Sequence, residues 1–267
     1  MKPPVALTIA GSDPSGGAGI QADLKTFHQF GAYGEAVITL LTVQNTVAVD
    51  DVKILEPAFV LAQLSAVLED IPPAAAKTGA LGGREMVEAI AFAASDFTFP
   101  LVVDPVMISK HGAPLIAEDA RLALIEQLLP ATTLLTPNLH EAAAITGRDV
   151  SKPEEMIDAA RAILDLGPGA VLIKGGHLSG EATDILLTQR GLTELPAPRI
   201  DTPHTHGTGC SYSAAITALL AGGSTIEEAV GRARAWIHNA IASNPGFGRG
   251  NGPVNHFAKP GPSSSGS

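Results

Sequence analysis

Short apolar runs alternate with longer amphipathic stretches along almost the whole chain. The apolar runs are rich in Val, Leu, Ile and Ala and are typical of strands buried on both faces of a sheet; they lie at 5–10, 36–42, 101–104, 133–136 and 170–174. The stretches between them carry apolar residues at helical spacing; they lie at 21–30, 57–70, 84–94, 118–129, 139–146 and 153–166. Helices are also expected at 209–220 and 226–243, and an antiparallel strand at the sheet edge at 184–188. This order predicts an α/β fold with a mainly parallel central sheet, helices on both faces in three layers, and ligands at the carboxyl ends of the strands.

The composition favours one large domain. Hydrophobic residues make up 45% of the 267 residues and charged residues 16%, so the chain has enough apolar material for a sizeable core. No linker rich in Pro, Gly or Ser interrupts residues 1–245, and no internal repeat is present. We therefore expect a single domain over 1–258, followed by a low-complexity tail at 259–267 that is expected to be disordered.

Charge and cysteine content exclude several classes of function. Lys and Arg number 17 against 27 Asp and Glu, a net charge of −10, which disfavours nucleic-acid binding. No apolar stretch reaches the length of a membrane span, and the N-terminus lacks a secretory pattern, so we expect a cytoplasmic protein. The single cysteine, Cys210, cannot form an internal disulfide or a multi-thiolate metal site.

The segment His-Gly-Thr-Gly-Cys at 206–210 carries the strongest local signal. Two glycines just before a helix direct backbone N–H groups into one concavity, which suits an anion. A thiol in the first helical turn is expected to have a lowered pKa, so Cys210 is either a base or nucleophile, or a buried inert side chain. A Cys–His hydrolase using His206 is a further alternative.

A Gly-rich turn at 16–22 opens the first expected helix. Its G-x-G-x-x-A spacing resembles a dinucleotide-binding fingerprint, but the acidic residue expected about twenty positions later is absent. The same turn lets the backbone approach another small ligand, with Asp13, Asp23 and Gln44 as polar contacts. The alternative for Asp23 is an exposed carboxylate in the first turn of a helix.

Three oxygen-bearing residues follow expected strands. Asp104 ends one strand, and Asn138 and Glu141 stand at the start of the helix after another, so they could hold Mg²⁺ through water beside phosphates. Asn138 and Glu141 also have the spacing of a helix capping box, which is the structural alternative for Glu141. Lys174, before a glycine turn, suits a phosphate contact.

Together these motifs resemble the hydroxymethylpyrimidine/phosphomethylpyrimidine kinases of thiamine biosynthesis, in the ribokinase-like superfamily. The similarity covers roughly residues 5–256. The segments that carry it occur in the family's order at 10–25, 41–46, 104–107, 136–141, 171–177 and 205–210.

The resemblance implies ATP-dependent phosphorylation of 4-amino-5-hydroxymethyl-2-methylpyrimidine and then of its monophosphate. It implies that Cys210 is the base in an anion hole formed with Gly207, Thr208 and Gly209. Asp104 and Glu141 would organise Mg²⁺, and Asn138 and Lys174 would face the nucleotide. The pyrimidine would be surrounded by Gly11, Ala18, Asp23, Gln44 and Val106. We also expect a homodimer.

Departures from the family pattern leave two alternatives. Ala80 stands where many members have Met, so the pyrimidine pocket is expected to be looser. Arg234 stands where a Lys is frequent, which leaves the adenine contacts undetermined. A pyridoxine or pyridoxal kinase of the same superfamily would use a similar phosphoryl site. An inactive small-molecule-binding homologue is the other alternative, against which the intact set Asp104, Glu141, Lys174 and Cys210 argues.

Overall fold

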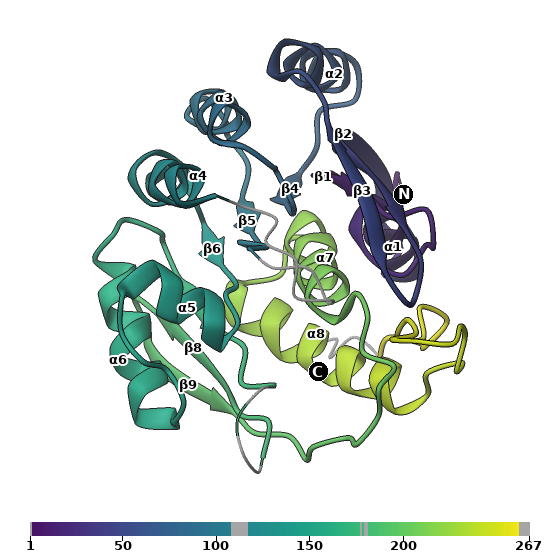
Figure 1. Ribbon diagram of the computed structural model, residues 1–267. Coiled ribbons are helices and arrows are strands. Elements are labelled where there is room, and N and C mark those ends of the chain that lie inside the picture. Colours follow the sequence, from purple (N-terminus) through teal and green to yellow (C-terminus); the bar gives the residue numbers. More distant parts are fainter. Residues whose placement is uncertain (1, 108–116, 177, 179–180, 262–267) are drawn as a thin grey trace.

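A computed structural model of the protein describes residues 2–107, 117–176, 178 and 181–261. Its described strands form one nine-stranded sheet with helices on both faces (Figure 1). The strands are β1 (Val5–Ser12), β2 (Tyr33–Gln44), β3 (Val49–Ile54), β4 (Ala75–Thr78), β5 (Leu101–Val103), β6 (Leu134–Leu135), β7 (Val171–Ile173), β8 (Asp184–Thr188) and β9 (Gly191–Leu195). The α-helices are α1 (Gly19–Gln29), α2 (Pro57–Asp70), α3 (Arg84–Ala94), α4 (Glu118–Ala123), α5 (Leu139–Thr146), α6 (Pro153–Leu164), α7 (Thr208–Ala221) and α8 (Ile226–Ala242). None of the helices in these ranges is long and apolar enough to cross a membrane.

The sheet order is β3-β2-β1-β4-β5-β6-β7-β8-β9. The central pairs from β2 through β7 are parallel, whereas β3, β8 and β9 each run antiparallel to a neighbour. Parallel strands end at the same edge, so the segments after β1, β4, β5, β6 and β7 meet there. The loops that carry most predicted site residues are therefore brought together by the sheet.

Alternate residues of each central strand enter opposite cores, as the two-residue period of a strand requires. On β5, Leu101 and Val103 pack with the helices α2 to α6, while Val102 packs with α7 and α8. On β7, Leu172 packs with α7 and α8, while Val171 and Ile173 pack in the core on the other face. Burial on both faces explains why these strands appear in the sequence as continuous apolar runs.

The predicted α/β architecture and most of its elements are confirmed. Helices α2, α3 and α5 have the predicted bounds, and α1, α6, α7 and α8 differ from prediction by one or two residues at either end. The helix expected over 118–129 is α-helical only to Ala123, after which the chain continues as a π-helical turn and a short 3₁₀ turn. The tail was expected to be disordered, but residues 262–267 lie outside the described residues.

The strict alternation of strand and helix is wrong at both ends of the sheet. β2 and β3 form an antiparallel pair, and β8 and β9 form another. The strand at 184–188 is antiparallel as predicted, but β9 covers it, so it is not the sheet edge. β3 and β9 were missed because they are mostly exposed and lack the apolar run that marks a buried strand.

Candidate active site

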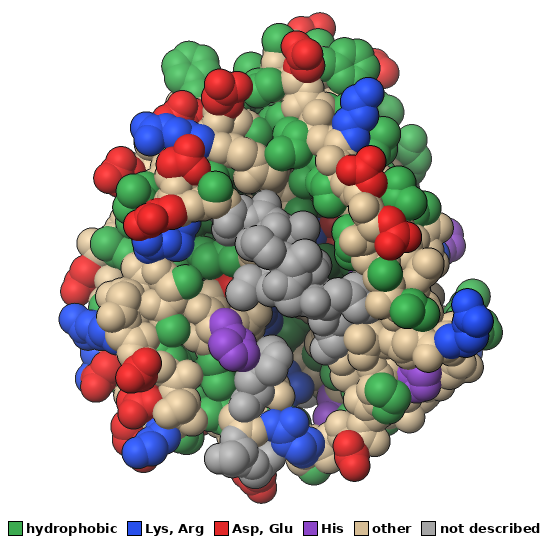
Figure 2. Space-filling view, viewed as in Figure 1, with side chains coloured by type: hydrophobic (Ala, Val, Ile, Leu, Met, Phe, Trp, Pro, Cys, Tyr) green, Lys and Arg blue, Asp and Glu red, His purple; other side chains and the backbone are tan. Residues whose placement is uncertain are grey.

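A cavity of about 570 Å³ lies at the carboxyl ends of the central strands. Its wall combines the turn after β1, the end of β2, the segments after β5, β6 and β7, and the N-terminus of α7. In Figure 2 most of the acidic and basic side chains lie toward the outline of this face. The size suits a small ring compound together with part of a nucleotide.

The structure brings the predicted site residues together, with one exception. Those that line the cavity are Gly11, Ala18, Gln44, Val106, Asp104, Asn138, Glu141, Lys174, Gly207, Thr208, Gly209 and Cys210. Ala80, singled out as a departure from the family, lines it as well. Asp23 does not line the cavity.

Asp23 lies beneath the cavity, fully buried in α1. Its Oδ2 accepts a hydrogen bond from Thr8 Oγ1 at 2.6 Å and pairs with Lys77 Nζ of β4 at 2.8 Å. Both charged side chains are fully buried, so the expectation of an exposed carboxylate is wrong, and the expectation that Asp23 contacts the pyrimidine is not met by its position. Asp23 and Lys77 therefore form a structural charge pair near Cys210. Burial lowers the pKa of Lys77, but its acidic neighbours, with Asp23 first among them, outweigh burial and keep that pKa raised.

At one end of the cavity, charged groups gather at the ends of β5, β6 and β7. Lys174 Nζ lies 2.8 Å from Asp104 Oδ1, and both side chains are largely buried. Asn138 pairs with Lys174 in an isolated parallel bridge, and the Lys174 N–H donates to the Pro137 carbonyl, so β6 and β7 stay in register beyond their ends. The burial of Lys174 lowers its pKa, but Asp104 and Glu141 outweigh this and raise it, so the ammonium stays charged for a polyphosphate.

Glu141 has both of the roles considered from the sequence. Its N–H donates to Asn138 Oδ1 and its Oε2 accepts the Asn138 N–H, which completes the predicted capping box of α5. Its side chain also lines the cavity. Burial raises the pKa of the Glu141 carboxyl to about 7, with Lys174 opposing and Asp104 adding to the shift.

The donor set fits Mg²⁺ only as part of a nucleotide complex. No group of three or more His, Cys, Asp or Glu side chains among residues 2–107, 117–176, 178 and 181–261 could hold a metal ion. Asp104 and Glu141 supply two carboxylates beside Lys174, and Mg²⁺ that is bound next to phosphates keeps waters and takes phosphate oxygens as its other ligands. The residues therefore fit an ion that arrives with ATP.

The anion hole predicted from the sequence corresponds to the N-terminus of α7. Gly207 has a φ of +75°, and a Cβ there would lie 1.8 Å from the Gly17 carbonyl oxygen, so only glycine fits. A Cβ on Gly209 would lie 3.3 Å from Lys174 Nζ, so the helix end sits directly against the charged group. In the described part of the chain, the N–H groups of Gly209 and Cys210 have no backbone hydrogen-bond partner and remain for an anion.

The expectation of a lowered thiol pKa is wrong for Cys210. Burial raises the pKa of its thiol to about 12, and although Lys77 and the Gly19 N–H lower it, they do not compensate. The helix N-terminus favours the thiolate, but desolvation by the surrounding protein outweighs it, although the side chain is only partly buried and lines the cavity. In the described structure Cys210 makes no hydrogen bond with His206, whose Nε2 contacts Asp13 and Gln44, so the Cys–His hydrolase arrangement is absent.

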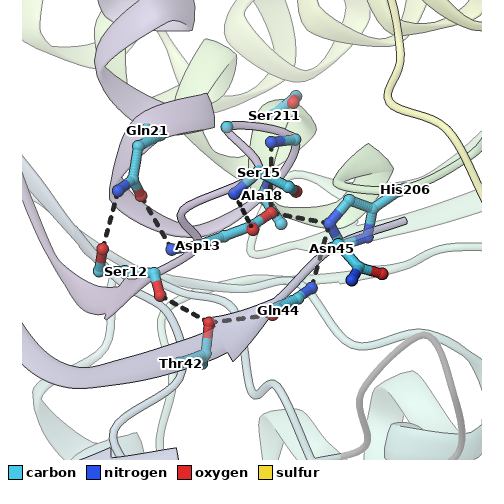
Figure 3. Close-up of polar contacts among 12 residues, drawn as sticks. Ser12, Asp13, Ser15, Ala18, Gln21, Thr42, Gln44, Asn45, His206 and Ser211 are labelled. Carbon is cyan, nitrogen blue, oxygen red and sulfur yellow. Dashed lines mark hydrogen bonds and ion pairs between the residues drawn. The ribbon is translucent and has the colours of Figure 1, made fainter. Parts of the chain in front are cut away.

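The other end of the cavity is a network of hydrogen bonds (Figure 3). Asp13 Oδ2 accepts from the N–H groups of Gly17 and Ala18 and lies 2.8 Å from His206 Nε2. Gln44 Nε2 lies 3.3 Å from the same imidazole nitrogen. Gln44 stands where the pairing of β2 and β3 shifts register, an irregularity that can redirect a side chain toward a site.

Sequence reasoning missed a second buried charge pair beside Lys174. Asp184 Oδ1 accepts the Gly175 N–H at 2.8 Å, and Asp184 Oδ2 lies 2.8 Å from Arg234 Nε of α8. Asp184 thus links the turn that follows Lys174 to α8. The sequence held a signal for this pair and for the pair of Asp23 with Lys77. Lys77 interrupts one apolar run and Asp184 begins another, and a charge buried in such a run requires a partner.

The sheet and the cavity at the carboxyl ends of its strands are those of an α/β kinase of the ribokinase-like type. The family model described as phosphomethylpyrimidine kinase matches residues 13–255. The chain belongs to the phosphomethylpyrimidine kinase family.

Individual relatives agree with the family. The chain is 50% identical over 257 residues to a hydroxymethylpyrimidine/phosphomethylpyrimidine kinase of Rhizobium meliloti, covering 95% of this chain and 97% of the relative. It is 47% identical to a thiamine biosynthesis bifunctional protein of Geobacter sulfurreducens, covering 94% of this chain and 52% of that protein. Among solved structures, an ADP complex of Bacillus subtilis pyridoxal kinase superposes with a TM-score of 0.87 at 38% identity, covering 96% of this chain and 98% of that one.

Proposed function

We propose that the protein transfers the γ-phosphoryl group of ATP to 4-amino-5-hydroxymethyl-2-methylpyrimidine, and then to the resulting monophosphate, in thiamine biosynthesis. The observation that carries this proposal is that one cavity is lined by Gln44 and Cys210, at the proposed ring end, and by Lys174 and Asn138, at the proposed phosphate end. The relatives' names support the same reaction.

The side chains divide the reaction among them. The hydroxymethyl oxygen forms a bond to the γ-phosphorus, the bond from that phosphorus to the bridging oxygen breaks, and ADP leaves. The N–H groups of Gly209 and Cys210 bind the transferred phosphoryl oxygens, and Lys174 neutralises their charge. A nucleotide-bound Mg²⁺, organised by Asp104 and Glu141, would supply further neutralisation of phosphate charge.

Cys210 is the proposed base for the hydroxyl proton. Because burial raises the pKa of its thiol to about 12, the thiolate is the minor form at neutral pH. Lys77 beneath it lowers this pKa, so the buried ion pair with Asp23 affects the fraction of thiolate. The base role therefore requires a rate that increases with pH.

A pyridoxal kinase remains the second candidate because of one residue. Ala80 lines the ring end of the cavity where many family members have Met, and pyridoxal kinases are among the structures of similar fold. A larger ring pocket favours phosphorylation of pyridoxine as a side activity. Gln44 favours the aminopyrimidine, since a carboxamide matches a ring nitrogen next to an exocyclic amine and pyridoxine has no such amine.

A coupled assay of ADP release separates these activities. The purified protein is given MgATP with the aminopyrimidine alcohol, with its monophosphate, or with pyridoxine. We expect turnover with both pyrimidines and a lower kcat/KM for pyridoxine. Turnover with pyridoxine alone would establish the second candidate, and ATP binding without turnover on any of the three would establish the inactive homologue.

The homodimer expected from the sequence is part of the proposal as well. Leu41, Val43 and Ile54 of the ribbon formed by β2 and β3 are between 43% and 57% exposed, which favours burial against a second copy. Sedimentation analysis of the protein and of its Val43→Glu variant tests this, because a dimer that uses the ribbon should dissociate in the variant. The cytoplasmic location stays a prediction.

A further inference from the structure

A continuous series of polar groups crosses the ring end of the cavity (Figure 3). It runs from the Ser12 carbonyl through Thr42, Gln44 and His206 to Asp13, and thus joins β1, β2 and the segment before α7. Each group limits the hydrogen positions of the next. The direction of the whole series is therefore fixed by the groups at its two ends.

At one end, Asp13 fixes the protonation of the imidazole. The Asp13 carboxylate accepts three backbone N–H groups, from Ser15, Gly17 and Ala18, so it is surrounded by donors. Burial raises the pKa of Asp13, but the hydrogen bonds from His206 and Ser15 outweigh it and lower the pKa, so the group is ionised. The imidazole Nε2, 2.8 Å from Asp13 Oδ2, must then carry a hydrogen and donate it.

At the other end, Thr42 has one hydroxyl hydrogen. Thr42 Oγ1 lies 2.9 Å from the Ser12 carbonyl oxygen, which can only accept, so the hydrogen is committed there. The Thr42 oxygen can then only accept from Gln44, whose Oε1 lies 3.3 Å away. If Oε1 pointed toward Thr42, two acceptors would face each other there. If Nε2 pointed toward His206, two donors would face each other at that end.

A half-turn of the Gln44 amide removes both conflicts. The one hydrogen on His206 Nε2 points to Asp13 at 2.8 Å and is then shared with the amide oxygen at 3.3 Å, and the amide nitrogen donates to Thr42 Oγ1. The amide oxygen and nitrogen of glutamine exchange places in this turn without other movement, so the hydrogen-bond partners decide the orientation. We propose that His206, held by Asp13, and Thr42 together fix the polarity of the Gln44 amide and are positioning residues for recognition of the amino-bearing edge of the substrate.

This inference rests on the proposed function and gives it a specific basis. In the fixed orientation the amide keeps one N–H and one oxygen lone pair for the cavity, which Gln44 lines. The positions of the remaining N–H and lone pair are fixed, so a ring nitrogen and a neighbouring exocyclic amine can pair with them in one orientation of the ring only. A freely turning amide would instead present either order and discriminate less between an amine and a group that lacks it.

The test compares the aminopyrimidine alcohol with its analogue that lacks the 4-amino group, at saturating MgATP. In the wild type we expect kcat/KM to favour the amino compound about 10- to 100-fold, the effect of a buried polar group left unpaired. In His206→Leu that preference should fall to about threefold or less, mainly through KM for the amino compound. In His206→Gln it should be largely restored, because the new amide nitrogen can donate to both Asp13 and Gln44.

Two further variants complete the experiment. Thr42→Val has nearly the same shape, removes the other fixed end and should also reduce the preference; it carries the test if His206→Leu does not fold. His28→Leu, on the exposed side of α1, is the matched control and should keep the wild-type preference. An unchanged preference in both His206→Leu and Thr42→Val overturns this inference alone, whereas a wild type that phosphorylates neither pyrimidine overturns the proposed function and the inference with it.

Discussion

At the proposed ring end of the cavity the lining polar groups include a carboxamide, a hydroxyl and an imidazole, whereas at the proposed phosphate end they include an ammonium and two carboxylates. The ring end is organised by directional hydrogen bonds, and its carboxylate, Asp13, accepts three backbone N–H groups. At the phosphate end charged groups are buried together, and burial raises the pKa of the Glu141 carboxyl to about 7. In the proposed function one end selects by hydrogen-bond direction and the other by charge, and each prediction below tests one of these two ends.

The largest effect is expected at the boundary between the two ends. Cys210→Ala should lower kcat by ~10²–10⁴-fold, the usual cost of losing a general base. In the wild type, log kcat/KM should increase with pH across the neutral range, since the thiol with a pKa of about 12 is protonated there. Turnover in Cys210→Ala near that of wild type, or the same pH slope in both proteins, would remove Cys210 from the role of base.

The buried pair beneath the cavity should affect stability more than recognition. Lys77→Met leaves the Asp23 carboxylate buried without its partner and should lower the free energy of unfolding by about 3–5 kcal/mol, measured in urea. The double variant Asp23→Leu with Lys77→Met should regain a large part of this, because the pair is then replaced by apolar groups. A loss below about 1 kcal/mol in the single variant would contradict the assignment of a structural pair.

The charged end should show its character in the Mg²⁺ dependence. Glu141→Gln removes the charge but keeps the capping box, which accepts Gln at that position, so α5 should form normally. We expect the Mg²⁺ concentration for half-maximal rate to increase about 10-fold. In the wild type this concentration should increase as the pH falls through about 7, because the proton competes with the ion for the Glu141 carboxylate, and in the variant it should not. An unchanged Mg²⁺ requirement leaves Glu141 with the capping role alone.

The smallest effect concerns the shape of the ring end. Ala80→Met fills part of the cavity wall and should reduce kcat/KM for pyridoxine by up to about 10-fold while affecting the aminopyrimidine less. The direct measurement is the ratio of kcat/KM for the two alcohols in both proteins. An unchanged ratio would show that discrimination depends on Gln44 and its hydrogen bonds and not on pocket volume.

Local patterns were sufficient for most of the fold and for most of the cavity wall. Val102 and Leu172 belong to apolar runs that only a sheet covered on both faces requires, and the Asn138 and Glu141 capping box is a property of four consecutive residues. β4 was missed because Lys77 interrupts its apolar run, and nothing near it in the sequence explains a buried lysine. Its partner Asp23 is 54 residues away and meets it only after α1 packs on the sheet.

The sequence by itself determined the alternation of strands and helices through most of the chain, the edge of the sheet at which the turns lining the cavity meet, and the small residues at the N-terminus of α7. Tertiary structure decided the chemistry of those groups, since burial is contributed by distant segments. It raised the pKa of Cys210 where the local helix end predicts a lower one, and it removed Asp23 from the cavity. It also joined Asp13 to His206, which are 193 positions apart, and brought Gln44 within 3.3 Å of the same imidazole. Hydrogen bonds between such distant groups form only in the folded chain, so the sequence alone does not reveal them.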